Sequence, residues 1–157
     1  MQKITPFLWF NDNTDEAIKF YTSVFKNSKL INANYYGDAG PGPKGTIMTA
    51  TIELEGQQFM LLNGGPIFKF TEAISLFVSC KTQEEVDYYW EKLGEDGRTN
   101  QCGWLDDKFG ITWQIVPTML DKVLQGGDPA KANRAMQAMM KMTKLDIQKL
   151  QDAYDGK

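Results

Sequence analysis

The sequence predicts an α+β fold in which two copies of a β-α-β-β-β module are followed by a helical extension. Three observations support this prediction. Strand-like apolar runs surround a segment of helical spacing in the first half of the chain, the same pattern returns in the second half, and the remaining residues have helical patterns only. We expect a single domain over residues 1–157, with the first module at 3–63, the second at 73–117 and the extension, here called the tail, at 118–157.

The first module is predicted to begin with a buried strand and an amphipathic helix. The apolar run Ile4–Phe10 suits a strand, and Asn13 is a good N-cap for the helix that follows. The apolar residues of this helix recur at three- and four-residue spacing: Ala17, Phe20, Tyr21, Val24 and Phe25. Three strands are then expected at 30–36, 46–54 and 58–63, with a glycine-rich hairpin loop at 37–45.

The second module is predicted to repeat this order. Residues 73–80 form its first strand, and Thr82 with Glu85 matches the capping box that precedes a helix. Six positions of the two helices match at a constant offset of 69 residues, which indicates an internal repeat. The matched pairs are Asn13 and Thr82, Glu16 and Glu85, Ala17 and Val86, Phe20 and Tyr89, Tyr21 and Trp90, and Val24 and Leu93. Short strands around 99–105, a turn at 106–110 and a last strand ending at Pro117 complete the copy.

The tail is predicted to be helical, with an apolar face but no core of its own. Thr143–Asp146 matches a second capping box, and Ile147, Leu150 and Tyr154 follow on one side of a helix. The methionine-rich segment 136–142 suits docking on an irregular apolar surface. We expect part of that surface to belong to a second subunit, which predicts a homodimer.

The composition excludes several classes of chemistry. The chain has no histidine, so no site can use imidazole as a base or as a metal ligand. Cys80 and Cys102 are too few for a disulfide framework or a four-thiolate zinc site. The net charge is −3, without basic clusters or a long apolar run, so we expect neither nucleic-acid nor membrane partners. The start at Met1 without a signal peptide predicts a reduced, cytoplasmic protein.

Two stretches of the chain resemble one known family. The first is Ile4–Phe10 with Asp15–Tyr21, and the second is Gly103–Gly110 leading to Trp113–Pro117. These motifs, together with the closing Met139–Ile147, are similar to those of the PhnB-like family. This family is part of the vicinal oxygen chelate superfamily, which includes glyoxalase, extradiol dioxygenase and bleomycin-resistance proteins. The resemblance implies the glyoxalase/bleomycin-resistance/dihydroxybiphenyl dioxygenase-like fold, in which each module curls its strands around a cup.

The resemblance also implies where a metal ion would be held. The superfamily places its ligands, commonly His and Glu, on the first and last strands of each module. The matching positions in this chain are Thr5 (or Pro6, if the register shifts by one), Met60, Ser75 and Gln114. Hydroxyl, thioether and amide groups offer a divalent ion too little negative charge to replace its hydration. We therefore predict a protein without a metal or another cofactor.

The predicted ligand-binding residues come from both modules and line the cup. They are Thr5, Phe7, Trp9, Met60, Ser75, Phe77, Trp104 and Gln114. Strand alternation puts Phe7 and Trp9 on the same face as Thr5. Aromatic residues on strands are more often part of a core, and Gln114 can equally be bonded to its strand neighbours. Trp104 is favoured as a site residue because it lies beside a turn.

Three further features have simpler interpretations. Asp106 and Asp107 are adjacent, so we expect them to point to opposite faces and to lie in a solvated turn. Without a histidine, neither Cys80 nor Cys102 has a partner that would generate a thiolate. The loop at 37–45 opens no helix, so it is not a phosphate-binding loop.

The sequence predicts a metal-independent, homodimeric protein that binds a small molecule, and whether it is an enzyme stays open. A first alternative is a metal-dependent isomerase, lyase or dioxygenase of the same superfamily that uses Glu53, Asp106 or Asp107 as ligands. A second is an interaction protein whose tail binds a groove of a partner. Some PhnB-like proteins are labelled demethylubiquinone methyltransferases, but this chain lacks the strand, Gly-x-Gly-x-Gly turn and helix of a common methyl-donor site.

Overall fold

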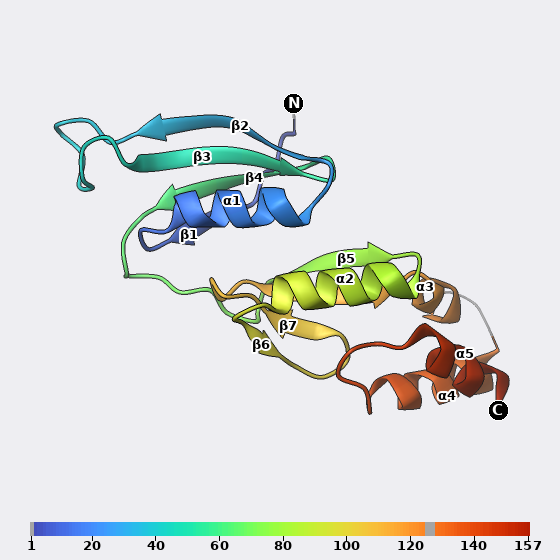
Figure 1. Ribbon diagram of the computed structural model, residues 1–157. Helices are drawn as coiled ribbons and strands as arrows, with labels where there is room; N and C mark the ends of the chain where they lie inside the picture. Colours follow the sequence, from blue (N-terminus) through green and yellow to red (C-terminus); the bar gives the residue numbers. More distant parts are fainter. Residues whose placement is uncertain (1, 125–127) are drawn as a thin grey trace. The chain divides into compact units, whose positions relative to one another are not determined.

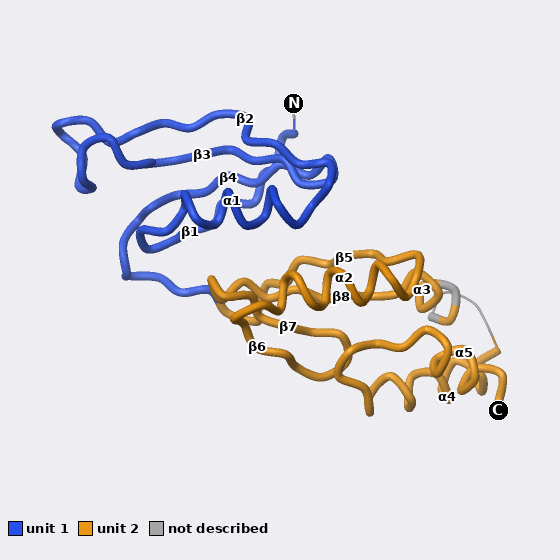
Figure 2. Tube along the Cα trace, viewed as in Figure 1, with its two compact units in different colours: residues 1–70 blue, residues 71–157 orange. Residues whose placement is uncertain are grey.

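A computed structural model describes residues 2–124 and 128–157 of the chain. The chain divides into two units, Met1–Phe70 and Thr71–Lys157, here called unit 1 and unit 2 (Figure 2). Each unit contains one four-stranded sheet. The boundary between the units falls in the segment that separates the two predicted modules.

Unit 1 has the predicted order of elements (Figure 1). They are β1 (Phe7–Phe10), α1 (Thr14–Val24), β2 (Ser28–Tyr35), β3 (Ile47–Leu54) and β4 (Gln57–Asn63). The strand order is β1-β4-β3-β2, in which β1 runs parallel to β4 and the other neighbours are antiparallel. The first strand begins at Phe7, later than the apolar run suggests, because Pro6 has no N–H to donate to a neighbouring strand.

Unit 2 repeats this topology with shorter strands. Its elements are β5 (Ser75–Cys80), α2 (Gln83–Gly94), β6 (Arg98–Thr99), β7 (Trp104–Asp106), β8 (Thr112–Pro117), α3 (Met119–Leu124), α4 (Pro129–Met139) and α5 (Ile147–Asp155). The strand order is β5-β8-β7-β6, and β5 runs parallel to β8 as β1 does to β4. The predicted α+β class, with two β-α-β-β-β modules and helices after them, is confirmed.

In unit 1, α1 packs on one face of the sheet. Its side chains Ala17, Tyr21 and Val24 are at most 2% exposed. Asn13 is the N-cap residue, as predicted, but its side chain makes no hydrogen bond to the helix. Instead, the amide oxygen of Asn63, at the end of β4, accepts a hydrogen bond from the Thr14 N–H at 3.0 Å. A residue distant in sequence therefore satisfies one of the free donors at the start of the helix.

In unit 2, α2 covers one face of the sheet and begins with the predicted capping box. The Thr82 hydroxyl accepts a hydrogen bond from the Glu85 N–H at 3.3 Å, and the Glu85 carboxylate accepts one from the Lys81 N–H at 2.6 Å. Val86 and Leu93 on this helix are fully buried. The hydrophobic core of unit 2 thus lies between α2 and the sheet.

The tail packs on its own unit. Leu120, Leu145 and Leu150 are buried together, and partly buried hydrophobic residues surround them: Val116, Met119, Met139 and Met142. The side chain of Gln83 connects α2 to this cluster, since it donates to Leu145 O at 3.2 Å and accepts from Ile147 N at 2.8 Å. The methionine face that we expected to meet a second subunit therefore contacts this chain through Met139 and Met142.

The cap of α5 differs from the prediction. The N-cap is Asp146, whose side chain accepts a hydrogen bond from Lys149 N, and not Thr143. The Thr143 carbonyl instead accepts a hydrogen bond from Gly103 N at 2.8 Å. This tertiary bond holds the backbone at Thr143 beside the loop that precedes β7. Among the described residues, no helix combines the length and the apolar character that crossing a bilayer requires.

Candidate functional site

The face of each sheet that lies opposite the helix, here called the open face, carries the predicted site residues. In unit 1, Phe7 pairs with Met60 and Trp9 pairs with Leu62, so these four side chains share this face. Phe7 is 49% exposed, whereas Phe10 on the other face is 2% exposed. Thr5 precedes β1 and is partly buried.

In unit 1, the rows of paired side chains that cross β1 and β4 continue onto β3. The side chains in these rows are apolar on β1 and β4 and polar on β3. Met60 pairs with Thr51, and Leu62 pairs with Thr49. The open face of unit 1 therefore has an aromatic half on β1 and a hydroxyl-bearing half on β3. Sequence reasoning missed Thr49, Thr51 and Leu62, although counting alternate residues from Met60 across the turn at Gly56 would have found them.

Trp9 is fixed by its neighbours and is not a free lining residue. Its indole N–H donates a hydrogen bond to Gly65 O at 2.9 Å, and its ring meets Phe68 edge-on with centroids 4.9 Å apart. A Cβ at Gly64 would lie within 2.2 Å of the indole, so only glycine lets the chain pass this closely. Trp9 therefore anchors the segment after β4 while it also forms part of the open face.

The open face of unit 2 brings together all four site residues that were predicted there. Phe77 and Trp104 both pair with Gln114, so the three side chains form one row across β5, β8 and β7. The Gln114 amide nitrogen donates a hydrogen bond to the Ser75 hydroxyl oxygen at 2.8 Å. Phe77 is 53% exposed, whereas Trp113 on the opposite face is 3% exposed. Gln114 is therefore both bonded to a strand neighbour and placed on the open face.

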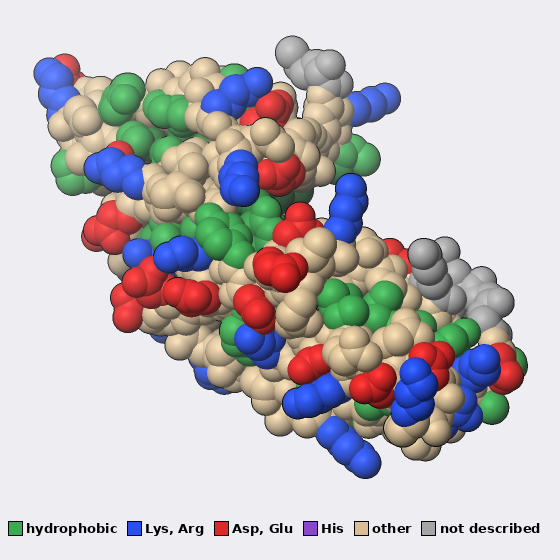
Figure 3. All heavy atoms as spheres, turned by 45° about the vertical axis from the view of Figure 1, so that its right-hand side comes forward, with side chains coloured by type: hydrophobic (Ala, Val, Ile, Leu, Met, Phe, Trp, Pro, Cys, Tyr) green, Lys and Arg blue, Asp and Glu red, His purple; other side chains and the backbone are tan. Residues whose placement is uncertain are grey.

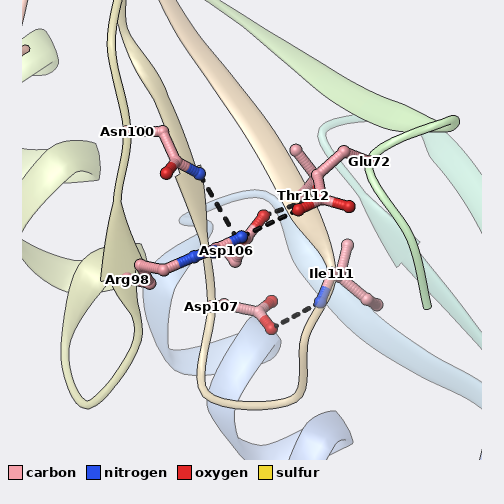
Figure 4. Close-up of polar contacts among 7 residues, drawn as sticks. All are labelled: Glu72, Arg98, Asn100, Asp106, Asp107, Ile111 and Thr112. Carbon is pink, nitrogen blue, oxygen red and sulfur yellow. Dashed lines mark hydrogen bonds and ion pairs between the residues drawn. The ribbon is translucent and has the colours of Figure 1, made fainter. Parts of the chain in front are cut away.

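A charged cluster lies in the next row of the same face (Figure 4). The carboxylate of Asp106 accepts hydrogen bonds from the Thr112 hydroxyl at 2.7 Å, from Arg98 Nε at 3.0 Å and Nη2 at 2.6 Å, and from the Asn100 amide at 3.4 Å. Arg98 Nη2 also donates to Glu72 at 2.7 Å. Burial raises the pKa of Asp106, but the hydrogen bonds from Thr112 and Arg98 outweigh it and the pKa lies below its ordinary value.

Asp107 points away from this cluster, as the alternation predicts. Its carboxylate accepts hydrogen bonds from the Phe109 and Ile111 N–H groups at 2.9 and 3.0 Å, and from the Trp113 indole at 2.8 Å. The prediction of a solvated turn is wrong, because Asp106 and Asp107 are only 9% and 3% exposed. The N–H and O–H groups that donate to these two carboxylates take the place of water. An aspartate that begins a tight turn and bonds the N–H two residues later is a signal that could have been used.

The carboxylates suggested as ligands for a metal-dependent alternative already form hydrogen bonds or an ion pair within the protein. Asp106 and Asp107 have the partners described above, and Glu53 forms an ion pair with Lys29 at 3.0 Å. The Lys29 hydrogen bond holds the pKa of Glu53 below its ordinary value. Within residues 2–124 and 128–157, no three His, Cys, Asp or Glu side chains are grouped so that they could hold a metal ion.

The positions at which the resemblance places metal ligands, two in each unit, do not fit a divalent ion. Their side chains are the hydroxyls of Thr5 and Ser75, the thioether of Met60 and the amide of Gln114. None carries a negative charge, and Ser75 and Gln114 are hydrogen-bonded to each other. In neither unit would a hard cation gain anionic ligands at these positions in exchange for its hydration shell.

Neither cysteine is placed as a nucleophile. Burial, with a smaller contribution from Glu85, raises the pKa of the Cys80 thiol to about 12. Cys102 is partly buried in the loop before β7, where its own N–H donates to Met142 O at 2.8 Å. No histidine is available to activate either thiol.

A separate hollow of about 420 Å³ lies on unit 1, between the end of β4 and the hairpin loop. Two of its hydroxyls are used internally: the Tyr36 hydroxyl donates to Asn63 O at 2.6 Å, and the Thr46 hydroxyl donates to Pro43 O at 2.7 Å. The loop folds over the ring of Tyr36, which is 7% exposed. The hairpin-loop side of this hollow therefore has a structural role.

Comparison with known proteins gives one family match. The family model described as 3-demethylubiquinone-9 3-methyltransferase matches residues 2–116. A PhnB protein from Bacillus cereus, described as a candidate 3-demethylubiquinone-9 3-methyltransferase, is 41% identical with a TM-score of 0.69 and covers 74% of this chain and 99% of that chain. The family match ends within β8, so it does not extend to the tail.

Two less similar solved structures share the fold alone. A protein from Pseudomonas aeruginosa is 22% identical with a TM-score of 0.62, and the match covers 74% of this chain and 98% of that chain. The fosfomycin resistance protein FosX from Listeria monocytogenes is 15% identical with a TM-score of 0.59, covering 80% of this chain and 98% of that chain. A search of curated proteins gives no match.

Proposed function

The chain belongs to the PhnB-like family of the vicinal oxygen chelate superfamily, and from this premise we propose that it is a small-molecule-binding protein that works without a metal ion. The proposed ligand contacts the open face of unit 2. The predictions of a homodimer and of a cytoplasmic location stay predictions.

The observation that carries this proposal is the row Phe77–Gln114–Trp104 on unit 2. Large aromatic side chains that stay exposed beside a few oriented polar groups are typical of ligand sites. Phe77 and, in unit 1, Phe7 are each about half exposed, at 53% and 49%. Hydrophobic side chains reach the surface of both units among interspersed charges of both signs (Figure 3). Covering an exposed phenylalanine with a flat ligand removes apolar surface from water, which favours binding.

The partners of the candidate metal-ligating carboxylates support a metal-independent function. The alternative of a metal-dependent isomerase, lyase or dioxygenase needs Glu53, Asp106 or Asp107 as a ligand. Each of these carboxylates already has a partner, which is Lys29, Arg98 or the Trp113 indole. Freeing Asp107 for a cation would leave the buried N–H groups of Ile111 and Trp113 without an acceptor, and freeing Asp106 would do the same to the buried Thr112 hydroxyl, which disfavours this alternative.

The methyltransferase description of the family is not supported by the residues at the strand-to-helix connections. A common methyl-donor site places a glycine-rich turn between a strand and a helix, so that backbone N–H groups approach the ligand. Here the three connections are residues 11–13, between β1 and α1, residues 81–82, between β5 and α2, and residue 118, between β8 and α3. None of them contains a glycine. We therefore do not assign methyl transfer to this chain.

The proposal is tested by screening neutral aromatic fragments for thermal stabilisation, once in excess chelator and once with added Mn²⁺. We expect hits whose stabilisation is the same under both conditions and is reduced in Phe77→Ser. Ile67→Ser is the matched control, because Ile67 is also exposed but does not lie on a strand. Fragment binding that appears only with Mn²⁺ would contradict the proposal.

A further inference from the structure

The hydrogen-bonded pair Ser75–Gln114 is the polar centre of the open face of unit 2. Its donor–acceptor distance is 2.8 Å, and both side chains are partly buried. Among the described residues, no other hydrogen bond to either side chain is formed. The pair is therefore oriented by one internal bond and keeps further hydrogen-bonding capacity for a ligand.

The remaining capacity of this pair includes both a donor and an acceptor. With the Gln114 nitrogen donating to Ser75, Gln114 keeps its amide oxygen and a second N–H, and Ser75 keeps its O–H. If the amide is rotated by 180°, Ser75 donates to the oxygen, and Gln114 keeps two N–H donors while the hydroxyl keeps a lone pair. In both arrangements the pair is uncharged and presents a donor next to an acceptor.

Aromatic side chains flank the Gln114 amide on two sides. Phe77 on β5 and Trp104 on β7 lie in the same row as Gln114, one strand away on either side. Neighbouring strands are about 4.8 Å apart, so a single ring laid along the row can contact an aromatic side chain while its edge meets the amide. A planar ligand is favoured over a bulky aliphatic one.

In the described part of the chain, the charged side chains of the adjacent row are already paired with one another. On one side, Asp106 is satisfied by its donors, and Arg98 is neutralised by Asp106 and Glu72. On the other side, Val116, two residues after Gln114 on β8, packs in the hydrophobic cluster of the tail. A charged ligand would lose hydration here without gaining an opposite charge.

From these observations we infer the ligand class: an uncharged planar molecule that carries a carbonyl and an adjacent N–H or O–H on one edge, as a lactam does. The edge pairs with Gln114 and Ser75, and the ring lies against Phe77 or Trp104. This inference rests on the proposed function, because it assigns a ligand class to the same site.

The test compares two probes that differ in one donor. Binding of 2-pyridone, which has a carbonyl next to an N–H, is measured by ligand-observed NMR against N-methyl-2-pyridone, which lacks the N–H. We expect the methylated probe to bind roughly three- to tenfold more weakly, the effect of one lost neutral hydrogen bond. Benzoate, which is planar but anionic, is expected to bind more weakly than either.

Substitutions show which residues distinguish 2-pyridone from N-methyl-2-pyridone. In Gln114→Leu the two probes should bind equally, and Ser75→Ala should reduce the difference between them. Ser79→Ala and Gln101→Leu are the matched controls, because Ser79 lies on the same face of β5 and Gln101 is exposed outside the row. Both controls should keep the wild-type preference, and near-UV circular dichroism checks that every variant is folded.

The outcomes separate this inference from the proposed function. Equal binding of the two probes by the wild type, or a preference that persists in Gln114→Leu, overturns the inference but leaves small-molecule binding intact. If no neutral aromatic probe binds the wild type, and Phe77→Ser gives the same result as the wild type, both the inference and the proposed function are overturned.

Discussion

Asp107 holds the turn between β7 and β8 together, because its carboxylate accepts hydrogen bonds from three buried or partly buried donors. Two come from the N–H groups of Phe109 and Ile111, and the third comes from the indole of Trp113. The turn therefore depends on a single side chain. Its neighbour Asp106 serves a different region, since its donors lie on the open face of the sheet.

We predict that Asp107→Ala lowers the free energy of unfolding by about 2–4 kcal/mol, because it leaves these donors without an acceptor. Urea unfolding followed by tryptophan fluorescence measures the effect. Glu91→Ala is the control, because Glu91 is an exposed carboxylate on α2 and its removal should change stability by less than about 0.5 kcal/mol. Equal stabilities of the two variants would contradict this role of Asp107.

Asp106 is predicted to make stability depend on pH in the acid range. Its folded pKa lies below the ordinary value of 3.8, so its stabilising contribution is fully present above that pH and is lost as the pH falls through the folded pKa. Asp106→Asn should cost about 1–2 kcal/mol at pH 7, a modest value because Arg98 is exposed to solvent. The difference between wild type and variant should shrink towards pH 3. Stability curves that stay parallel from pH 7 to 3 would rule out this linkage.

At the scale of elements, the tail is attached by specific contacts and not by a general apolar face. Gln83 bonds the backbone on both sides of Asp146, and the N–H groups of Cys102 and Gly103 bond the carbonyls of Met142 and Thr143. Gly103 has a φ of +81°, and a Cβ there would lie 2.8 Å from Ile115 O and 3.0 Å from Leu145. The approach of the tail therefore requires a glycine at this position.

We predict that Leu145→Ala lowers the free energy of unfolding by about 2–5 kcal/mol, since this side chain is fully buried between the tail and β8. Met140→Ala is the control, because Met140 is 64% exposed and its truncation leaves no cavity. Urea titrations of both variants provide the comparison. A loss below 1 kcal/mol in Leu145→Ala would show that the tail is only loosely docked.

The elements also show which local signals in the sequence are reliable. The apolar spacing of both helices and the capping box at Thr82 are confirmed, because neighbouring residues alone decide them. Asn13 is the N-cap residue as predicted, but the side chain that bonds the start of the helix is that of Asn63. The cap predicted at Thr143 is wrong, because Asp146 is the N-cap and the Thr143 carbonyl bonds to Gly103. Contacts between distant residues override a local preference and leave no local trace in the sequence.

For the whole molecule, the repeat is what made the fold predictable. The constant offset between the two helices implies the same topology twice, and both sheets have it, with β1 parallel to β4 and β5 parallel to β8. Part of the site follows from alternation alone, as the shared face of Phe77 and Gln114 illustrates. The burial of Asp106 and Asp107 could not be predicted, because it depends on donors that only the folded turn and sheet bring together.

The central claim is that the superfamily's metal positions here hold neutral groups that bind an organic ligand. Isothermal titration calorimetry of the chelator-treated protein with Mn²⁺, Zn²⁺, Ni²⁺ and Fe²⁺ tests it most directly. We predict no stoichiometric binding at micromolar concentrations of any of these ions. One-to-one micromolar binding that is weakened by Gln114→Leu would contradict the claim.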